Sequence, residues 1–486
     1  MSLASLANDK IIDARSLAEN RLNTERLVLS KSSEAYCIFS RQDESGFVIV
    51  KTERGMTPRI VAFSEECSWD EAAMPPAVLE WLNHLEASSP ISTSEARNLS
   101  PQNKSDVQPL LTCHWHQNSP YNDLAPVITD GQVKTVAGCV AIAAAQVTYY
   151  WRRDNPEFTM KDTPVYTYGG APITYMVPKG SPNNWDLILD TYDSSSSQES
   201  RAAAAQLCYV LGTTSYLNYA SSTGGSIHEA GNAMYSQYRL LSTYINRGDS
   251  LDDWEGMLYK ELANGRPVVC SGSGQGGHAF VLDGYDSHTN LYHFNFGWGG
   301  SGDGYYPADE SPEAMGGYYQ GQAVLVNVHP LIRNIESSLF NEGVYNGYLN
   351  ISIKVNNNST LPLQDLYLFI VSGKNPTDVS QAIWHGSEVA NDGTPRIYNV
   401  QIPFSVIPPK IKLLLTDESL NELVTEQWDV TNIDYSRKEK EMHKYRTYDM
   451  SGNRIKHIPR HGLYILFDTY GAKKIQSLQH DINSNK

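Results

Sequence analysis

The sequence predicts an α+β chain in which a region of mixed helices and strands is followed by an all-β region. Three observations lead to this prediction. The 486 residues exceed the length at which a single hydrophobic core stops growing, so two to four domains are expected. Helical and strand patterns alternate up to about residue 330, whereas alternating strands separated by Asn-rich turns dominate afterwards. A hydrophobic content of 41% supplies material for a core in each part.

Composition and charge narrow the class of function. The net charge of −16 argues against nucleic acid or an anionic membrane as the main partner. No apolar run is long enough for a membrane span, and the first residues lack the basic and apolar regions of a signal peptide. The 6 cysteines form no C-x-x-C pair, so neither a zinc ribbon nor a thioredoxin motif is present. No metal or other cofactor is expected. The 30 tyrosines, with many Asn, Ser and Gly, suit a secreted, cell-surface or periplasmic protein.

Residues 1–105 are predicted to form a small α+β unit. A loose helical face at residues 9–29 precedes three strands, and Pro75-Pro76 then opens a second helix, at a position where helices tolerate proline. Residues 87–106 have no periodicity and are rich in Ser, Asn and Thr, so they are expected to be an exposed, cleavable linker. The expected strands are residues 35–40, 46–51 and 59–63.

The second unit, residues 106–330, contains a thiol at the start of an alanine-rich helix. Cys139 opens the run GCVAIAAAQV at residues 138–147, which has the apolar character of a buried helix. Unpaired N–H groups and the positive end of the helix dipole favour a thiolate at that place, which suggests a nucleophile. The alternative is a core cysteine, because free Cys is often buried.

A base for this thiol is offered by His278, which two glycines precede and a buried strand follows. It lies 139 positions after Cys139, within the spacing of papain-like enzymes. A histidine satisfied at the start of a strand is the alternative. The next strand ends in Asn295, whose amide is expected to accept the Nδ1–H of His278 and leave Nε2 facing the thiol. A structural amide is the other interpretation of Asn295. Gln117 is a candidate second donor, beside the N–H of Cys139, to an oxyanion.

After residue 330 the pattern is that of an all-β, immunoglobulin-like sandwich, expected over residues 331–436. The charged run beginning at Arg437 is expected to be a linker, and residues 437–486 a tail that contains a small hairpin. The expected sandwich strands are residues 348–355, 366–371, 397–402 and 411–415.

Four segments together resemble the streptopain family of secreted papain-like cysteine proteases, including its Bacteroidetes-type relatives. The resemblance covers about residues 107–328. It extends to residues 45–50 and 57–61, which are similar to the inhibitory propeptide of that family. The four segments are HQNSPYN at 116–122, GCVAIAAAQV at 138–147, GGHAFVLDGY at 276–285 and FNFGWGGSGDGYY at 294–306.

The resemblance implies a papain-like catalytic domain that follows an inhibitory propeptide. It further implies endopeptidase activity on protein or peptide substrates, with an apolar residue preferred two positions before the scissile bond. The chain's own propeptide would be its intramolecular inhibitor. The implied site roles are Cys139 as nucleophile, His278 as base and acid, Gln117 as oxyanion donor, Asn295 beside the histidine, Trp298 in shaping the site, and Gly276, Gly277, Gly225 and Ser226 as walls of the substrate pocket.

One position departs from the family pattern. Phe296 stands where a tryptophan directly follows the asparagine in the family, so an indole N–H is absent there, while Trp298 is kept. This departure and the large β region motivate a second hypothesis, a catalytically silent papain-like unit in a binding or adhesion protein. A metal site at Cys113-His114-Trp115-His116 is a third, weaker interpretation, because no partner cluster of ligands accompanies it.

Overall fold

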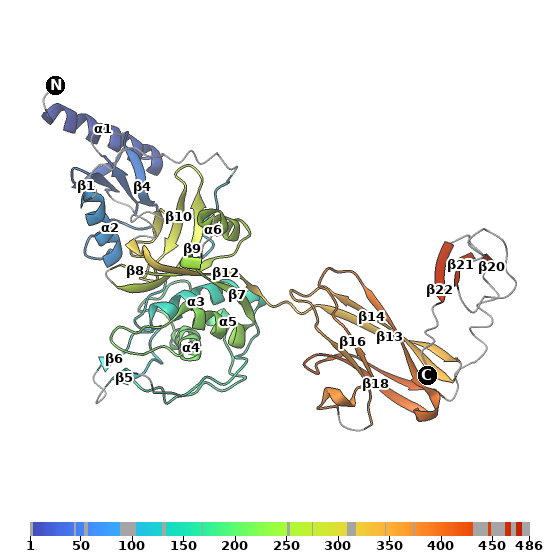
Figure 1. The fold of residues 1–486 in the computed structure, drawn as a ribbon. Coiled ribbons are helices and arrows are strands. Elements are labelled where there is room, and N and C mark those ends of the chain that lie inside the picture. The colour runs from blue at the N-terminus through green and yellow to red at the C-terminus, as the bar shows by residue number, and fades with distance from the viewer. Residues whose placement is uncertain are drawn as a thin grey trace. The chain divides into compact units, whose positions relative to one another are not determined.

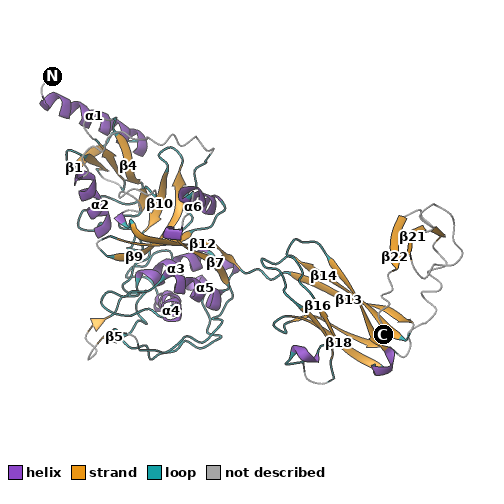
Figure 2. Ribbon diagram, in the orientation of Figure 1, coloured by secondary structure: helices purple, strands orange, loops and turns teal. Residues whose placement is uncertain are grey.

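The computed structural model describes residues 3–42, 45–52, 57–87, 104–128, 133–167, 169–249, 253–274, 276–308, 317–345, 347–372, 375–430, and the strands at 446–448, 462–467 and 473–478. The chain divides into two compact units, residues 1–331 and residues 332–486 (Figure 1). Helices and strands mix in the first unit, whereas strands dominate the second (Figure 2). The predicted α+β class is confirmed. The expected linkers at residues 87–106 and 437 onward lie largely outside the described residues.

A ten-stranded antiparallel sheet runs through the whole first unit in the order β1-β2-β3-β4-β11-β10-β9-β8-β12-β7. Four of its strands come from the N-terminal subdomain, residues 3–87, and six from later in the chain. The strands are β1 (Leu27–Ser32), β2 (Tyr36–Arg41), β3 (Phe47–Lys51), β4 (Arg59–Ser64), β7 (Leu240–Asn246), β8 (Val268–Ser273), β9 (Gly277–Asp286), β10 (Leu291–Asn295), β11 (Gly304–Tyr306) and β12 (Gln320–Pro330).

Helices cover both faces of this sheet and create two main cores. One core packs α3, α4 and α5 against one face of β8, β9 and β12. The other packs α2 and α6 against the opposite face and includes the aromatic side chains of Phe280 and Phe294. Because successive strand residues point to opposite faces, β9 contributes to both cores. The helices are α1 (Leu3–Leu22), α2 (Pro76–Ala87), α3 (Cys139–Tyr150), α4 (Gln198–Thr214), α5 (Ile227–Tyr238) and α6 (Trp254–Ala263).

The N-terminal subdomain joins the rest of the sheet through β4 and β11, where Phe63 pairs with Tyr305. Their rings stack with centroids 4.4 Å apart, and the guanidinium of Arg21 lies 3.6 Å from the centroid of Phe63. Trp81 of α2 is fully buried and meets Tyr306 edge to face. The subdomain therefore shares its hydrophobic core with the region that follows it.

The second unit contains the expected β-sandwich. A three-stranded sheet, β13-β14-β17, and a four-stranded sheet, β16-β15-β18-β19, enclose one core of aliphatic side chains. The sequence patterns located β14, β15, β17 and β18 but missed β13, β16 and β19. The expected tail hairpin is part of a three-stranded sheet. The strands are β13 (Ile335–Tyr345), β14 (Tyr348–Asn357), β15 (Leu366–Ile370), β16 (Trp384–Gly386), β17 (Arg396–Pro403), β18 (Lys410–Asp417), β19 (Glu422–Asp429), β20 (Arg446–Tyr448), β21 (Gly462–Phe467) and β22 (Lys473–Leu478).

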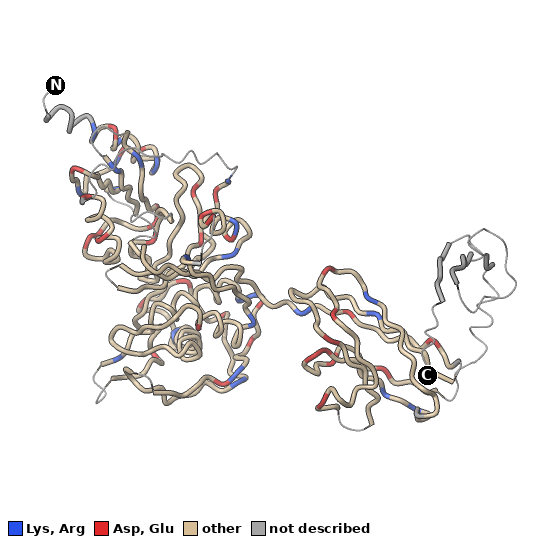
Figure 3. The backbone as a smooth tube through the Cα atoms, viewed as in Figure 1, with Lys and Arg blue, Asp and Glu red and all other residues tan. Residues whose placement is uncertain are grey.

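Charged residues are interleaved along both units, and acidic residues are not gathered in one block (Figure 3). Among the described helices, none combines the length and apolarity that crossing a bilayer requires.

Replacing Phe63 with alanine is expected to weaken the join between the two parts of the sheet. The change removes a fully buried ring that stacks on Tyr305, and such core truncations cost about 3 to 5 kcal/mol. Urea unfolding of the full chain, with hydrogen exchange at β4 and β11, measures the effect. Val28→Ala on the same sheet removes a side chain that is 42% exposed and should cost less than about 0.5 kcal/mol. Equal losses in both variants would contradict the shared core.

Candidate active site

Cys139 is the first residue of α3, and its position depends on the glycine before it. Gly138 caps the helix with a positive φ of 94° and no side-chain hydrogen bond. A Cβ at Gly138 would lie 2.8 Å from Cγ2 of Thr223, so no other residue fits there without a shift. The helix behind is buried from Val140 to Tyr149, as its apolar sequence predicts. The half-buried thiol therefore stands at the N-terminal end of a buried helix.

Burial outweighs the helix terminus in setting the protonation of this thiol. The largest effect is desolvation, which raises the pKa of Cys139. Hydrogen bonds from the N–H groups of Ala279, Val140 and Cys139 itself act in the opposite direction but are smaller. The net pKa is raised, so the expectation that the helix N-terminus favours the thiolate is not met in this state of the protein. The effect of the Ala279 N–H on this pKa nevertheless indicates that the backbone beside His278 lies near the sulfur, since Ala279 directly follows His278.

His278 lies near the start of β9 and is 7% exposed. Its Nε2 is 2.8 Å from the carbonyl oxygen of Phe296, and the indole Nε1 of Trp298 is 3.1 Å from the same nitrogen. A carbonyl can only accept a hydrogen bond and an indole N–H can only donate one, so the two contacts compete for Nε2. The contact to the carbonyl is the shorter, which favours a proton on Nε2. Nδ1 is then the unprotonated nitrogen. This reverses the predicted tautomer, in which Nε2 faces the thiol.

The imidazole of His278 is neutral at ordinary pH in this structure. Burial lowers the pKa of His278 to about 4, and the hydrogen bond to Phe296 offsets this only in part. In the described parts of the chain, no hydrogen bond or ion pair joins His278 to Cys139. The ring is instead surrounded by Trp298, edge to face at 5.6 Å, and Tyr318 at 5.1 Å. A neutral thiol and a neutral imidazole thus replace the expected ion pair.

Asn295 does not accept a hydrogen bond from His278, contrary to the prediction. Asn295 pairs across the hairpin with Val281, which lies three positions beyond His278. Its Nδ2 donates to the carbonyl of Cys113 at 2.9 Å, and its Oδ1 accepts from Gln146 and from the N–H of Gly297, each at 3.1 Å. The prediction failed because the hairpin register places Asn295 opposite Val281, where its amide binds Cys113 and Gln146 instead. The carbonyl of the next residue, Phe296, contacts His278 instead.

Gln117 and Trp298 lie on a cleft with a volume of about 520 Å³. The carbonyl of Gln117 accepts a hydrogen bond from the N–H of Ala137 at 2.9 Å, two residues before Cys139. The backbone that carries Gln117 is therefore tied to the entry into α3. Sequence reasoning did not identify the other lining residues, which are His116, Asn118, Val136, Ser221, Ser222 and Gly297.

The four residues expected to form walls of a substrate pocket have different surroundings. Gly276 and Gly277 are exposed, and a Cβ on either would meet nothing within 4 Å. Gly225 packs on Leu217, where a Cβ would come within 2.1 Å of Cδ2. The hydroxyl of Ser226 accepts from the N–H of His228 and caps α5. The loop before α5 meets the cleft through Ser221 and Ser222 instead.

The side chains of the Cys113–His116 segment diverge, which removes the support for a metal site there. Cys113 is buried, and burial raises the pKa of its thiol well above the ordinary value. His114 contacts Asp303 through Nδ1 at 3.3 Å, while Nδ1 of His116 accepts from the N–H of Asn118 at 3.1 Å. All six cysteines of the chain are free thiols.

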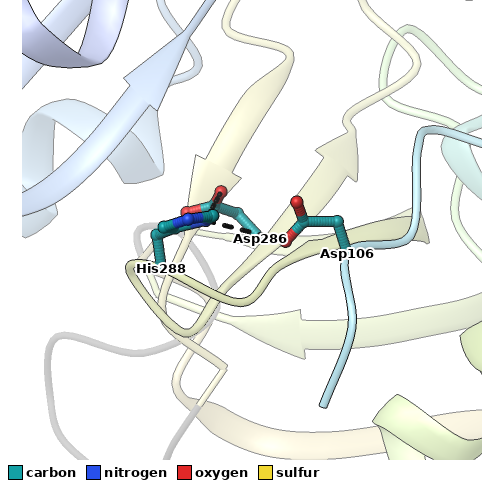
Figure 4. A group of neighbouring side chains, drawn as sticks. All are labelled: Asp106, Asp286 and His288. Carbon is teal, nitrogen blue, oxygen red and sulfur yellow. Dashed lines mark ion pairs between the residues drawn. The ribbon is translucent and has the colours of Figure 1, made fainter.

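A second group of titratable side chains lies away from this site, at the turn between β9 and β10. Asp106, Asp286 and His288 place their ligand atoms within 4.8 Å of one another (Figure 4). Hydrogen bonds from Ser287 to Asp106 and from Thr289 to Asp286 already occupy the carboxylates, and the His288 side chain is 82% exposed. The group fastens the chain at Asp106 to the hairpin.

Comparison with known proteins shows the family of the chain. Residues 115–306 match the model of the peptidase C10 family, and residues 6–88 match that of the Spi protease inhibitor. The chain is 31% identical over 322 residues to streptopain of Streptococcus pyogenes serotype M1, an alignment that spans 59% of this chain and 78% of that protein. The chain belongs to the streptopain family of cysteine proteases. It is a protease zymogen with an N-terminal inhibitor domain.

Three further similarities concern two other species. The thiol protease/hemagglutinin PrtT of Porphyromonas gingivalis is 25% identical over 388 residues, covering 71% of this protease and 44% of PrtT. Among solved structures, a prointerpain A fragment of Prevotella intermedia aligns with a TM-score of 0.49 and 23% identity, over 62% of this chain and 97% of the fragment. Active interpain A aligns with a TM-score of 0.41 and 28% identity, over 46% and 96% of the two chains.

The stability of this protease is expected to depend on the charge of His114. A hydrogen bond to Asp303 is the main reason that the pKa of His114 is raised, with Glu66 acting in the same direction and His293 against it. A raised pKa means that the stabilisation is complete below pH about 6.5 and is lost as pH rises through the pKa of the folded state. Urea unfolding between pH 5 and 9 should therefore show wild type losing its advantage over His114→Gln as pH rises.

His288→Gln is the matched control, because that side chain is 82% exposed. It should leave the pH dependence close to that of wild type. A constant difference between wild type and His114→Gln across the whole range would show that the imidazole acts through packing and not through its charge.

Proposed function

We propose that this protease is a secreted cysteine endopeptidase that hydrolyses peptide bonds through a Cys139 thiolate and His278. The observation that supports this most directly is that the N–H of Ala279 lies close enough to the thiol to act on its pKa, because Ala279 is the residue after His278. Two segments 139 positions apart thus bring a nucleophile and a base to the same place. The cleft beside them is lined by Gln117 and Trp298.

The reaction follows from these groups. Nδ1 of His278 takes the proton of the Cys139 thiol, and the sulfur attacks the scissile carbonyl carbon to form a C–S bond. Negative charge moves to the carbonyl oxygen, where the N–H of Cys139 and the amide of Gln117 are the proposed donors. The imidazolium then protonates the leaving amine, and the acyl-enzyme is hydrolysed by water that the same histidine activates. The hydrogen bond from Nε2 to Phe296 is compatible with both charge states of the ring.

The inhibitor domain is proposed to hold the chain inactive until it is removed. With this domain present, the pKa of Cys139 is raised and that of His278 is lowered, so the pair stays neutral. The subdomain borders the site, since Gly317 lies against α2, where a Cβ would come within 2.0 Å of the carbonyl of Ala77. Tyr318, the next residue, contacts the imidazole. Gly276, Gly277, Gly225 and Ser226 remain the predicted pocket walls, with an apolar side chain as the preferred occupant.

Cys139→Ala is expected to abolish both casein hydrolysis and self-processing, because no other nucleophile replaces the sulfur. Purified full-length wild type and variant are incubated and followed by mass spectrometry, which locates any cleavage within the expected linker at residues 87–106. Cys208→Ala removes a buried thiol in α4 and serves as the control. If wild type does not cleave itself or a peptide under reducing conditions, the endopeptidase proposal fails. A silent binding protein acting through its β-sandwich would be the better explanation.

Alkylation of Cys139 is expected to be slow in the full chain at pH 7 and at least about 10-fold faster after removal of the inhibitor domain. Only the thiolate reacts, and its fraction rises once the pair can ionise. Timed labelling with iodoacetamide, read by peptide mass spectrometry, gives both rates. Cys67, also half-buried, is an internal reference in the full chain. Equal rates for Cys139 before and after processing would exclude inhibition through protonation.

A further inference from the structure

A buried carboxylate that the mechanism does not use lies behind the histidine. Asp303 is 1% exposed and follows the loop that carries Phe296 and Trp298. Its Oδ1 accepts a hydrogen bond from the N–H of Phe296 at 2.8 Å. Its Oδ2 lies 3.3 Å from Nδ1 of His114. Burying a carboxylate costs free energy unless it is paired, so both contacts compensate its position.

The backbone of Phe296 links this carboxylate to His278. The N–H of Phe296 is held by Asp303, and the carbonyl of the same residue accepts the Nε2–H of His278 at 2.8 Å. The peptide unit that contains this carbonyl is also held from its other side, because the N–H of Gly297 donates to Oδ1 of Asn295. Two buried side chains, Asp303 and Asn295, thus fix the direction of the one carbonyl that orients the imidazole.

The loop needs such a constraint because its sequence is rich in glycine. Gly297, Gly299 and Gly300 all have positive φ, and glycine leaves the backbone more freedom than any other residue. A carboxylate also accepts a backbone N–H more strongly than a neutral group does. Without Asp303, one of the two constraints on the carbonyl of Phe296 is lost, and the orientation of Nδ1 of His278 is weakened with it.

These contacts belong to the protease part of the chain. Asp303, His114 and Phe296 all lie after the inhibitor domain, which meets the loop only from behind. There, Sγ of Cys67 accepts from the N–H of Gly302 at 3.2 Å, and Glu66 lies 3.8 Å from Nε2 of His114. The hydrogen bond between Asp303 and Phe296 is therefore internal to the mature enzyme and is retained after processing.

We propose that Asp303 is a positioning residue for catalysis, which fixes the orientation and tautomer of His278 through the backbone of Phe296. This inference rests on the proposed function, since it assigns a role in the same reaction. Asp303 itself touches neither the thiol nor the carbonyl of the substrate.

The test compares Asp303→Leu, which keeps the approximate volume but offers no acceptor, with Asp303→Asn, which retains an oxygen for the N–H of Phe296. After self-processing, Asp303→Leu should lose roughly 100-fold in kcat with KM within about 2-fold, because misplacing a reacting group acts on the chemical step. Asp303→Asn should recover most of that loss. Equal losses in both variants, or a loss confined to KM, would overturn the inference.

Asp283→Asn is a closely matched control. Asp283 is also fully buried, also pairs with a histidine, His293, at 2.6 Å, and also accepts one backbone N–H, from Leu111 at 3.0 Å. It makes no contact with the Phe296 loop among the described residues. If Asp283→Asn lowers kcat more than Asp303→Asn and Asp303→Leu do, buried charge in general is responsible and the inference fails.

A second measurement does not depend on turnover. In the full-length Cys139→Ala chain with ¹⁵N-labelled histidine, the nitrogen shifts of His278 should report protonation at Nε2. The same shifts are expected in the Asp303→Asn background. In Asp303→Leu or Asp303→Ala the shifts should instead report a mixture of the two tautomers. An unchanged tautomer in whichever acceptor-free variant folds would overturn the inference. Absence of proteolysis by wild type would sink the proposed function alone, because this readout would still decide the role of Asp303.

Discussion

The antiparallel pairing of β9 with β8 and β10 is the constraint on which the site depends. β9 is buried on both faces, with Val281 in the core beneath α3 and Phe280 in the opposite core. That double burial leaves the strand no freedom to slide, because a shift of one residue would exchange its two faces. His278, near the start of the strand, is consequently held at a fixed height beside the helix that carries Cys139. The register of the sheet therefore determines where His278 lies relative to Cys139.

Desolvation is the dominant electrostatic effect once these groups are in place. It raises the pKa of Cys139 and lowers that of His278, and in each case the opposing hydrogen bonds are weaker. Both shifts favour the uncharged form, as burial does for any titratable group. The thiol and the imidazole are therefore both neutral in the structure of the full chain.

The inhibitor domain is integrated into the protease and is not merely attached to it. Its strands extend the protease sheet, and α2 lies in the same core as the aromatic side chains of β9 and β10. At the edge of that contact, Glu66 and Cys67 reach the back of the loop that orients the histidine. The same loop therefore responds to two neighbours, the buried Asp303 inside the protease and the inhibitor domain outside it.

The sequence by itself was sufficient for the local features of this protein. The apolar run after Cys139 predicted a buried helix that begins with the thiol, and alternating residues located part of the strands of each unit. Its motifs identified the protease family, because such motifs are contiguous and are read without knowledge of the fold. Which atoms meet across the site was decided only by the tertiary structure. The hairpin register placed Asn295 opposite Val281, three positions from His278, and it is the Phe296 carbonyl that meets the imidazole. Hairpin register is not encoded in periodicity alone. The neutral state of the thiol likewise arises from burial by segments far apart in the chain, which no local pattern can report.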